Sequence, residues 1–254
     1  MPITIKSARE IELMTEAGRI LEIVHDELAK ALHPGMSTMD IDQLGEEVIR
    51  SYGCIPSFLD YNGYPASICV SVNDEVVHGI PDRHRILQDG DVVSLDAGVI
   101  YKGYHSDAAR THAVGKVSTE AQKLMDVTKQ SFFEGIKMAK EGQHLHDISR
   151  AIEEYVTPYG YGIVRDLVGH GIGTALHEDP QIPNYAQKRR GVRLQAGMTL
   201  AIEPMINAGS WEVDWMDDDW TVVTRDRSLS AHYENTILIT DGEPRILSLT
   251  EDTP

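Results

Sequence analysis

The chain contains few cysteines and no long apolar run. Its two cysteines, Cys54 and Cys69, are too few for a disulfide framework, which favours a reducing compartment. No apolar run approaches the roughly 20 residues that a membrane span needs. The N-terminal residues also lack the apolar core and cleavage site of a signal peptide. We therefore expect a cytoplasmic protein with no membrane partner.

Basic residues are also scarce relative to acidic ones. Lys and Arg number 23 against 40 Asp and Glu, and the formal net charge is −17. Contacts with phosphate groups need clustered cations, so DNA and anionic membranes are excluded as broad binding surfaces. A solvated acidic surface accounts for most of the excess, and bound cations are a second way to neutralise it.

An internal repeat is visible when the chain is compared with itself. Residues 35–53 align without gaps on residues 142–160, and seven of the nineteen positions are identical. The same offset of 107 places Asp96 on Glu203. Two separate matches at one offset predict two related halves, at about 5–115 and 118–248. No Gly/Ser/Pro-rich linker separates the halves, which favours a single domain that spans residues 1–254.

The halves show the same order of predicted elements. In the first half, helices begin at the Ser7-x-x-Glu10 capping box and again before Ile41. The remaining predictions are strands over 66–72, 91–100 and 105–114, helices over 119–140 and 145–156, and strands near 163–168, 198–206 and 231–239. This order predicts an α+β fold, in which two pseudo-symmetric halves form a shared sheet with its helices on one face.

Two aspartates lie on either side of a predicted hairpin turn. Residues 99–104 connect the strands of Asp96 and Asp107, and Gly103 is available for a positive φ. The midpoint between the aspartates falls in this turn, so we expect them to face each other across the ladder, about 5 Å apart. Two like charges in that position repel each other unless a cation lies between them.

The repeat adds two further acids to this pair. Glu203 is the repeat partner of Asp96, and Glu234 matches Asp107 if residues 206–229 are an insertion. Four carboxylates need about four positive charges, which two divalent ions provide. His170, between glycines, offers a nitrogen ligand, and this mixture suits Mn, Fe, Co or Zn. Two such ions would activate a bridging water for attack on a carbonyl.

Single aspartates and histidines are usually structural, and it is the repeat and the hairpin that distinguish these residues. His105 and His232 precede Asp107 and Glu234 by two positions. They are candidates for groups that orient the carboxylates.

The residues resemble a known family, the methionine aminopeptidases of type I, which have the pita-bread metallopeptidase fold of peptidase family M24. The resemblance covers residues 5 to about 249. Its motifs, in chain order, are Val72-Asn-Asp-Glu-Val-Val-His78-Gly-Ile-Pro81, Ser94-Leu-Asp96-Ala-Gly, Gly103-Tyr-His-Ser-Asp107-Ala-Ala-Arg-Thr, Gly169-His170-Gly-Ile-Gly, Ile202-Glu203-Pro and Glu234-Asn-Thr. Type I is indicated by the short spacing between His177 and Glu203 and by the lack of an N-terminal Cys/His zinc region.

The resemblance implies a fold of two pseudo-symmetric halves around a curved sheet and a site with two divalent ions, Co, Mn, Fe(II) or Zn. It implies that Asp107 and Glu234 bridge both metals, that His170 and Glu203 complete one site, and that Asp96 chelates the other. Glu203 would also accept a proton from the bridging water.

The reaction implied by the resemblance is removal of the initiator methionine from nascent proteins whose second residue is small. The bridging water or hydroxide would attack the first peptide bond. His78 and His177 would contact that bond and stabilise the tetrahedral intermediate.

The resemblance also implies a pocket for the methionine side chain. Its lining residues would be Phe58, Tyr61, Tyr64, Cys69, His78, Leu176, His177 and Trp220. Phe58 and Leu176 depart from the cysteine and the larger aromatic residue expected there. Aromatic rings and sulfur suit a thioether. The acidic, tryptophan-containing segment 211–220 is expected to form a loop or hairpin beside the pocket.

Two alternatives share the fold. A proline-directed aminopeptidase uses the same five ligands but usually carries a large additional N-terminal domain. A non-catalytic binding protein of this fold would typically lack several ligands. The expected partner is the N-terminal peptide of a nascent protein, with the ribosome near its exit site as a candidate docking partner. We expect a monomer.

Overall fold

The computed structural model describes residues 3–249. It contains four α-helices in this part of the chain: α1 Ala8–Ala31, α2 Thr38–Ser51, α3 Thr119–Ile136 and α4 Leu145–Val156. The predicted capping box is present at the start of α1, where the Ser7 side chain accepts from the backbone N–H of Glu10 and the Glu10 side chain accepts from that of Ser7. This reciprocal pair satisfies donors that the first turn of a helix leaves open.

The repeat has a direct structural explanation at the starts of α2 and α4. Asp40 and Asp147, identical in the repeat, each accept a hydrogen bond from the backbone N–H three residues earlier, at 2.9 and 3.0 Å. Gly35 and Gly142 precede these helices with φ values of 92° and 85°. A positive φ of this kind favours glycine. The repeated residues are therefore those that begin the second helix of each half.

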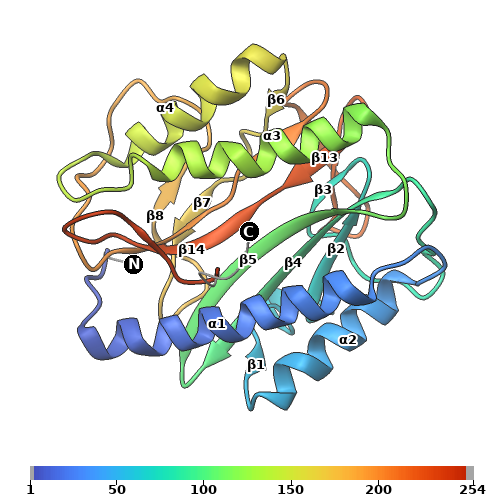
Figure 1. The fold of residues 1–254 in the computed structure, drawn as a ribbon, viewed down its shortest axis with the longest axis horizontal. Helices are drawn as coiled ribbons and strands as arrows, with labels where there is room; N and C mark the ends of the chain where they lie inside the picture. Colours follow the sequence, from blue (N-terminus) through green and yellow to red (C-terminus); the bar gives the residue numbers. More distant parts are fainter. Residues whose placement is uncertain (1–2, 250–254) are drawn as a thin grey trace.

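Most strands form one large sheet. Its nine strands are ordered β1-β4-β5-β14-β9-β7-β8, with β2 also paired to β4 and β15 to β14. The bounds are β1 Ile55–Pro56, β2 Ile68–Val72, β4 Val92–Tyr101, β5 Tyr104–Ala113, β7 Gly169–Gly171, β8 Glu178–Ile182, β9 Thr199–Ile202, β14 Glu234–Leu238 and β15 Arg245–Ile246. Strands of both halves meet where β5 pairs with β14, at the centre of the sheet (Figure 1).

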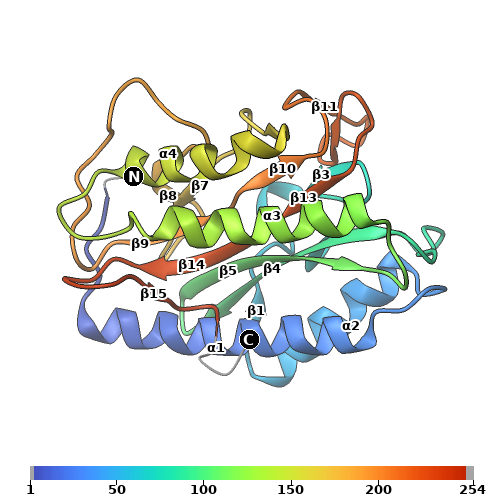
Figure 2. The same cartoon turned by 45° about the horizontal axis from the view of Figure 1, so that its top comes forward.

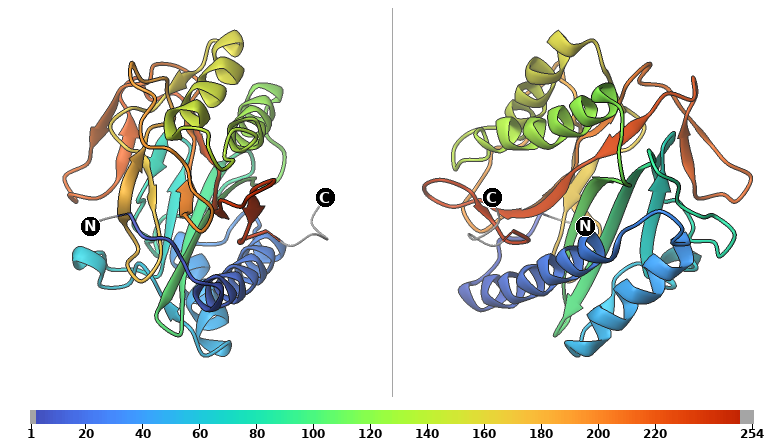
Figure 3. Two further views of the ribbon diagram at one scale, coloured as in Figure 1. Left: turned by 90° about the vertical axis from the view of Figure 1, so that its left-hand side faces the viewer. Right: turned by 45° about the vertical axis from the view of Figure 1, so that its right-hand side comes forward.

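All four helices pack on one face of this sheet, as Figures 2 and 3 show. Helix α1 contacts β4 and β5, and α2 contacts β2. Apolar side chains beneath them, such as Leu95 and Ala97, are fully buried in a core with Ile20 and Val24 of α1. A second core lies beneath α3 and α4. The predicted α+β fold, with a shared sheet and helices on one face, is confirmed.

Several predicted boundaries are wrong. The predicted strand 198–206 is divided into β9 and β10 (Met205–Asn207), with Pro204 between them, because proline has no N–H for the ladder. Similarly, 231–239 is divided into β13 (Ser230–His232) and β14. The helix predicted over 119–140 ends at residue 136.

The predicted strand 163–168 is also wrong, since it keeps only its first residue within β6 (Gly162–Ile163). The chain then leaves the sheet, and the Arg165 guanidinium stacks on the rings of Trp211 and Tyr185, 4.5 and 5.4 Å from their centroids. Strand β6 pairs with β10 in a separate three-stranded sheet, β13-β10-β6.

The segment predicted as an insertion forms a hairpin. Strands β11 (Val213–Trp215) and β12 (Val222–Thr224) pair with each other, and β12 pairs with β3 (Glu75–Val77) in a third sheet. The expectation of a hairpin in the tryptophan-containing segment agrees with this structure. No helix among residues 3–249 is long and apolar enough to cross a membrane.

Candidate active site

A cavity of about 460 Å³ is lined by residues of the large sheet, among them Asp96 of β4, Asp107 of β5 and His170 of β7. Side chains alternate between the two faces along a strand. Leu95 and Ala97 enter the core beneath the helices, so Asp96 between them points to the other face. Every residue that the sequence analysis assigned to the site lines this cavity: Phe58, Tyr61, Tyr64, Cys69, His78, Asp96, Asp107, His170, Leu176, His177, Glu203, Trp220 and Glu234.

The five candidate metal ligands come from five adjacent strands. In sheet order, Asp96 lies on β4, Asp107 on β5, Glu234 on β14, Glu203 directly after β9, and His170 on β7. The first two belong to one half of the repeat and the others to the second half. The pairing of β5 with β14 therefore brings the two sets of ligands together.

The relation between Asp96 and Asp107 differs from the prediction. They do not lie directly opposite each other, because Asp96 pairs with Ala109 and Asp107 pairs with Gly98. The hairpin turn consists of the two residues 102 and 103, both with positive φ, and this tight turn sets the register. The aspartates are diagonal neighbours on the same face of the sheet, within reach of each other.

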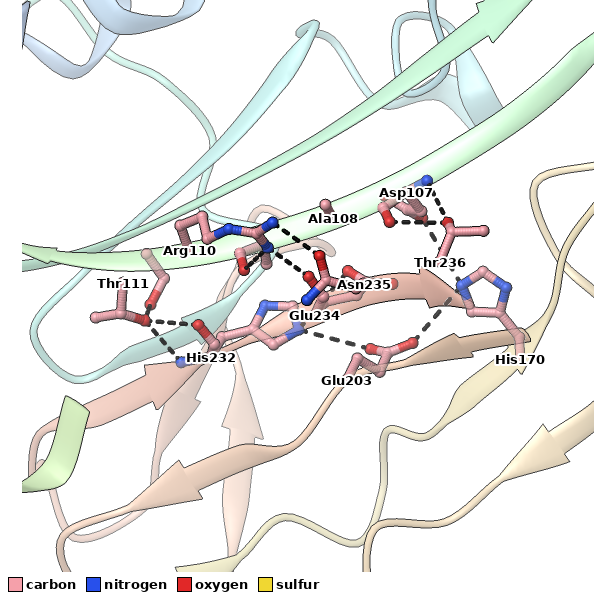
Figure 4. A network of polar contacts seen from close by, with 12 residues as sticks. Asp107, Ala108, Arg110, Thr111, His170, Glu203, His232, Glu234, Asn235 and Thr236 are labelled. Atoms are coloured by element: carbon pink, nitrogen blue, oxygen red, sulfur yellow. Dashed lines mark hydrogen bonds and ion pairs between the residues drawn. The ribbon is translucent and has the colours of Figure 1, made fainter. Parts of the chain in front are cut away.

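His170 presents a lone pair to the acids. Its Nδ1 lies 2.9 Å from the carbonyl oxygen of Gly171. A carbonyl only accepts, so Nδ1 carries the proton and Nε2 keeps its lone pair. Burial lowers the pKa of His170 to about 3, so the ring is neutral. Its Nε2 lies 3.7 Å from Asp107 Oδ2 and 3.6 Å from Glu203 Oε1, two further acceptors (Figure 4).

The carboxylates destabilise one another when they are ionised. Burial raises the pKa of Asp96 to about 7. Burial, together with repulsion from Asp96 and Glu203, raises the pKa of Asp107 well above its ordinary value. The pKa of Glu203 and that of Glu234 are raised well above their ordinary values for the same reasons, first burial and then the neighbouring acids.

A cation would satisfy this arrangement. Among the described residues, oxygens of Asp96, Asp107 and Glu234 are buried without a hydrogen-bond partner. Ligand atoms of Asp107, His170 and Glu234 all lie within 4.8 Å of one another. Buried polar atoms normally have partners, and here the closest neighbours of these oxygens are other carboxylates and the lone-pair nitrogen of His170. The donor set, carboxylates with a neutral imidazole, fits divalent transition metals.

Arg110 supports the acids from the helix face of the sheet. It donates to the backbone carbonyl of Glu234 at 2.6 Å and to the Asn235 side chain at 2.7 Å, and it forms a buried ion pair with Glu22 at 3.1 Å. These contacts hold the start of β14 beside β5 (Figure 4). The side chain of Arg110 is thus a structural support for Glu234, which sequence reasoning did not identify.

Two threonine hydroxyls link β5 to neighbouring strands: Thr236 bridges the seam between β5 and β14, and Thr111 connects β5 with β13. The Thr236 hydroxyl accepts from the backbone N–H of Asp107 at 2.8 Å and donates to its carbonyl at 2.9 Å. The Thr111 hydroxyl makes the same pair of bonds with the backbone of His232, at 2.9 and 2.7 Å. The Thr236 hydroxyl therefore positions the backbone of Asp107, and the Thr111 hydroxyl holds the end of β13, two residues before Glu234, against β5.

The two histidines proposed to orient carboxylates differ. His232 Nε2 lies 3.9 Å from oxygens of both Glu203 and Glu234. His105 Nδ1 instead lies 3.0 Å from the Ser57 hydroxyl. In this structure His232 therefore lies beside candidate ligands, and His105 has a structural contact.

His78 enters the cavity from an unusual backbone conformation, with φ of 59°. The next residue, Gly79, lies so close to β2 that an added Cβ would be 2.3 Å from the Val70 carbonyl oxygen. The Gly79 carbonyl also accepts from the Tyr64 hydroxyl at 2.9 Å. Burial lowers the pKa of His78 to about 4, so its imidazole is neutral at pH 7. A strained backbone held by close packing is common at functional sites.

His177 also lines the cavity, and its side chain is exposed. Its Nδ1 forms a hydrogen bond of 2.7 Å with the Tyr61 hydroxyl. The centroid of its ring lies 4.3 Å from that of His170. It therefore stands next to the candidate ligands and can contact a molecule in the cavity.

An apolar wall completes the cavity. Phe58, Tyr64, Cys69 and Leu176 are buried in one cluster, with Trp220 packed against it. The rings of Tyr64 and Trp220 meet edge to face, with centroids 5.1 Å apart. Burial raises the pKa of the Cys69 thiol well above its ordinary value, so the sulfur is uncharged. This wall suits an apolar, polarizable side chain.

Sequence reasoning missed several residues that line the cavity: Asn62, Val168, Gly169, Glu178, Asp179 and Gln181. One of them carried a local signal. Gln181 pairs with His170 across β7 and β8, and it lies two residues after Asp179, so both fall on the same face of this strand. The importance of Glu178 depends on a partner far away in the chain, which no local pattern indicates.

Comparisons with known proteins agree with this geometry. The family model described as "Metallopeptidase family M24" matches residues 12–241. The methionine aminopeptidase of Clostridium acetobutylicum is 54% identical over 249 residues, which cover 98% of this chain and 100% of that protein. The crystal structure of a methionine aminopeptidase from Thermotoga maritima superposes with a TM-score of 0.96 at 44% identity, covering 98% of this chain and 100% of the other.

The fold also extends to proline peptidases. An Xaa-Pro dipeptidase from Bacillus anthracis has a TM-score of 0.79 at 25% identity. The matched region covers 98% of this chain but only 63% of the dipeptidase chain. The matched family and the near full-length similarity confirm the resemblance found in the sequence. The chain belongs to metallopeptidase family M24.

Proposed function

We propose that this protein is a metal-dependent aminopeptidase that removes the N-terminal methionine of newly made proteins when the second residue is small. The observation that carries the proposal is the juxtaposition of two features in one cavity. Carboxylates with unpartnered buried oxygens lie beside a neutral imidazole, and an aromatic wall with a buried sulfur lies next to them. The first feature fits a metal centre, and the second fits a methionine side chain.

We propose that Asp96, Asp107, His170, Glu203 and Glu234 hold two divalent ions, of Co, Mn, Fe(II) or Zn. When bound, the ions would supply Lewis acidity and lower the pKa of a water. Asp107 on β5 and Glu234 on β14 lie between the strands that carry the other ligands. This central position supports the proposal that these two carboxylates would bind both ions.

The remaining groups act on the substrate in this proposal. Glu203 accepts the proton of the attacking water. Its side chain lines the cavity and is 13% exposed there, so a water in the cavity can reach its carboxylate oxygens. His78 and His177 both line the cavity and donate hydrogen bonds where the carbonyl oxygen develops charge. Both imidazoles lie beside the cavity rather than within the group formed by Asp107, His170 and Glu234.

The methionine side chain would pack against the wall of the cavity formed by Phe58, Tyr61, Tyr64, Cys69, Leu176 and Trp220. The free α-amine would approach the ion held by Asp96, which limits cleavage to N-termini. Further parts of the proposal are a single catalytic domain, a monomeric state and cytoplasmic location. The substrate is the N-terminal peptide of a nascent protein, and the ribosome near its exit site is the candidate place of docking.

The second candidate is a proline-directed aminopeptidase, because the Xaa-Pro dipeptidase shares the fold. That protein is substantially longer than the matched region, whereas the methionine aminopeptidases match from end to end. A non-catalytic binding protein is disfavoured by the presence of all five ligands and both histidines in the cavity.

Peptide hydrolysis after chelation tests the proposal. Metal is removed, and Mn, Co, Fe(II) or Zn is added back with Met-Ala-Ser, Met-Glu-Ser, or Met-Pro and Ala-Pro peptides. We expect metal-dependent release of methionine from Met-Ala-Ser, with Met-Glu-Ser and Ala-Pro uncleaved. The matched control is Asp96→Asn in the same assay. Cleavage of Ala-Pro alone would support the proline peptidase, and no cleavage of any peptide would support a binding protein.

A further inference from the structure

A buried ion pair joins the N-terminal segment to the far side of the cavity. Lys6 Nζ lies 2.8 Å from Glu178 Oε2, and both side chains are only 5% exposed. The Thr4 hydroxyl donates to the same oxygen at 3.1 Å and also contacts the Lys6 ammonium. Burial favours the neutral form of Glu178, but Lys6 outweighs it and holds the pKa of this carboxyl below its ordinary value. The Glu178 carboxyl is therefore held in its ionised form, and the pair is almost completely buried.

Lys6 itself is held firmly. Its backbone N–H donates to the Gly197 carbonyl at 2.8 Å, and the next residue, Ser7, caps α1. Gly197 has a φ of 91°, and an added Cβ there would lie 2.6 Å from a side-chain atom of Ile5. The ammonium therefore projects from a segment anchored to the sheet on one side and to α1 on the other.

The turn of residues 173–178 closes around this pair. The second oxygen of Glu178, Oε1, accepts from the backbone N–H of Ala175 at 3.3 Å. A Cβ added at Gly173 would lie 2.5 Å from Glu178 Oε1 and 2.6 Å from Lys6 Cε. The Gly173 carbonyl accepts from the backbone N–H of His105 at 2.8 Å. A side chain at position 173 would therefore press against the ion pair where the turn passes it.

The same turn carries two residues of the cavity wall. Leu176 is buried in the apolar cluster, and His177 faces the cavity with its hydrogen bond to Tyr61. Removing one member of a buried ion pair leaves an uncompensated charge, which the surrounding structure must move to solvate. Loss of the Lys6 ammonium would therefore release the Glu178 carboxylate and shift the turn that places His177.

We propose that Lys6 is a positioning residue for the reaction: through Glu178 it holds the turn 173–178 so that the His177 imidazole meets the substrate. The role rests on the proposed function of the cavity, because His177 is the group through which Lys6 acts. Residues remote from the chemistry can have large effects, since a displacement of about 1 Å can lower a rate about 100-fold.

The first experiment compares Lys6→Met with Lys6→Arg, using full-length protein and the peptide Met-Ala-Ser. Rates are expressed per folded, metal-loaded molecule, which removes any loss due to unfolding. We expect Lys6→Met to lower kcat about 10- to 100-fold with little change in KM, and Lys6→Arg to retain most activity. Lys30→Met is the matched control, because Lys30 pairs with Glu27 on the exposed side of α1. An unchanged kcat in Lys6→Met would overturn the proposal.

The second experiment asks whether Lys6 acts through His177. In the His177→Ala background, Lys6→Met should have no further effect on kcat, because the group that it positions is gone. A full 10- to 100-fold loss in that background would show a general structural role and overturn the proposal. If Lys6→Met does not fold, Thr4→Val takes its place, since it removes one hydrogen bond to the same Glu178 oxygen and should show a smaller effect of the same kind.

A third measurement does not depend on turnover. In protein with isotope-labelled histidines, the imidazole NMR signal of His177, assigned from the His177→Ala variant, should shift in Lys6→Met. The signal of His84, which is exposed and far from the turn in sequence, should not shift. An unmoved His177 signal overturns the positioning role. Failure of the wild type to release methionine would instead overturn the proposed function, while this signal still reports on Lys6.

Discussion

Replacing Asp96 with asparagine should stabilise the metal-free protein at alkaline pH while removing part of its response to metal. In the metal-free state Asp96 shares the bottom of the cavity with Asp107, Glu203 and Glu234, and burial raises its pKa from 3.8 to about 7. Asparagine has nearly the same shape but carries no charge at any pH. The substitution therefore removes one of four mutually repelling groups with little change in packing.

The direction in which the stability of the metal-free protein changes with pH follows from proton linkage. Between about pH 4 and pH 7 the folded protein keeps a proton on Asp96 that the unfolded chain has lost. The stability of the metal-free protein therefore falls as the pH rises through this window, and the full penalty is present above pH 7. The difference in pKa corresponds to roughly 4 kcal/mol. We expect about half of this, ~2 kcal/mol, after local relaxation, which is ~4–8 °C in Tm for a chain of this size.

Thermal unfolding of chelated protein at pH 5 and pH 8 measures this effect. At pH 8 the Asp96→Asn variant should melt higher than the wild type by ~4–8 °C, and the difference should shrink at pH 5. Added Mn should raise the Tm of the wild type more than that of the variant. Asp241→Asn, at an exposed position, is the control. If chelated Asp96→Asn melts no higher than chelated wild type at pH 8, the reasoning about repelling carboxylates is refuted.

Three further predictions concern single residues. Glu203→Gln should lower turnover of Met-Ala-Ser by at least ~10²-fold while circular dichroism remains unchanged, because it removes the proton acceptor; wild-type turnover would contradict its assignment. His78→Ala should lower kcat but leave metal content per molecule unchanged, as measured by elemental analysis, and a loss of metal would make His78 a ligand. Gly79→Ala should destabilise the protein by ~1–3 kcal/mol in denaturant unfolding, because its Cβ would lie 2.3 Å from the Val70 carbonyl; unchanged stability would argue against that close contact.

Local features of the sequence predicted the elements and the chemistry of the candidate site well. Capping residues such as Ser7 and Glu10 act within one helical turn, so their pattern is complete in a short segment. Repeated glycines such as Gly35 and Gly142 occupy positive φ in both halves. The repeat therefore predicted the same order of helices and strands in both halves. It also indicated that acids at related positions belong to one site.

The register of the central hairpin was not determined at this level. The midpoint of Asp96 and Asp107 suggested that they lie opposite each other, but the two-residue turn at 102–103 shifts the pairing so that they are diagonal. A shift of two residues keeps both side chains on the same face, because side chains alternate with a period of two. The prediction that both aspartates lie at one site is therefore correct, although the predicted pairing of the two residues is wrong.

By itself the sequence determined the order of most helices and strands, the α+β class, the repeat and the choice of candidate ligands, because each depends on neighbouring residues or on a motif. Tertiary structure alone decided that β14 pairs with β5, that Arg110 holds the backbone of Glu234, and that Lys6 pairs with Glu178 across 172 positions. Contacts between distant segments depend on how whole layers pack, and no local periodicity encodes them. The positions of His177 and of the ligands relative to one another are therefore properties of the folded chain.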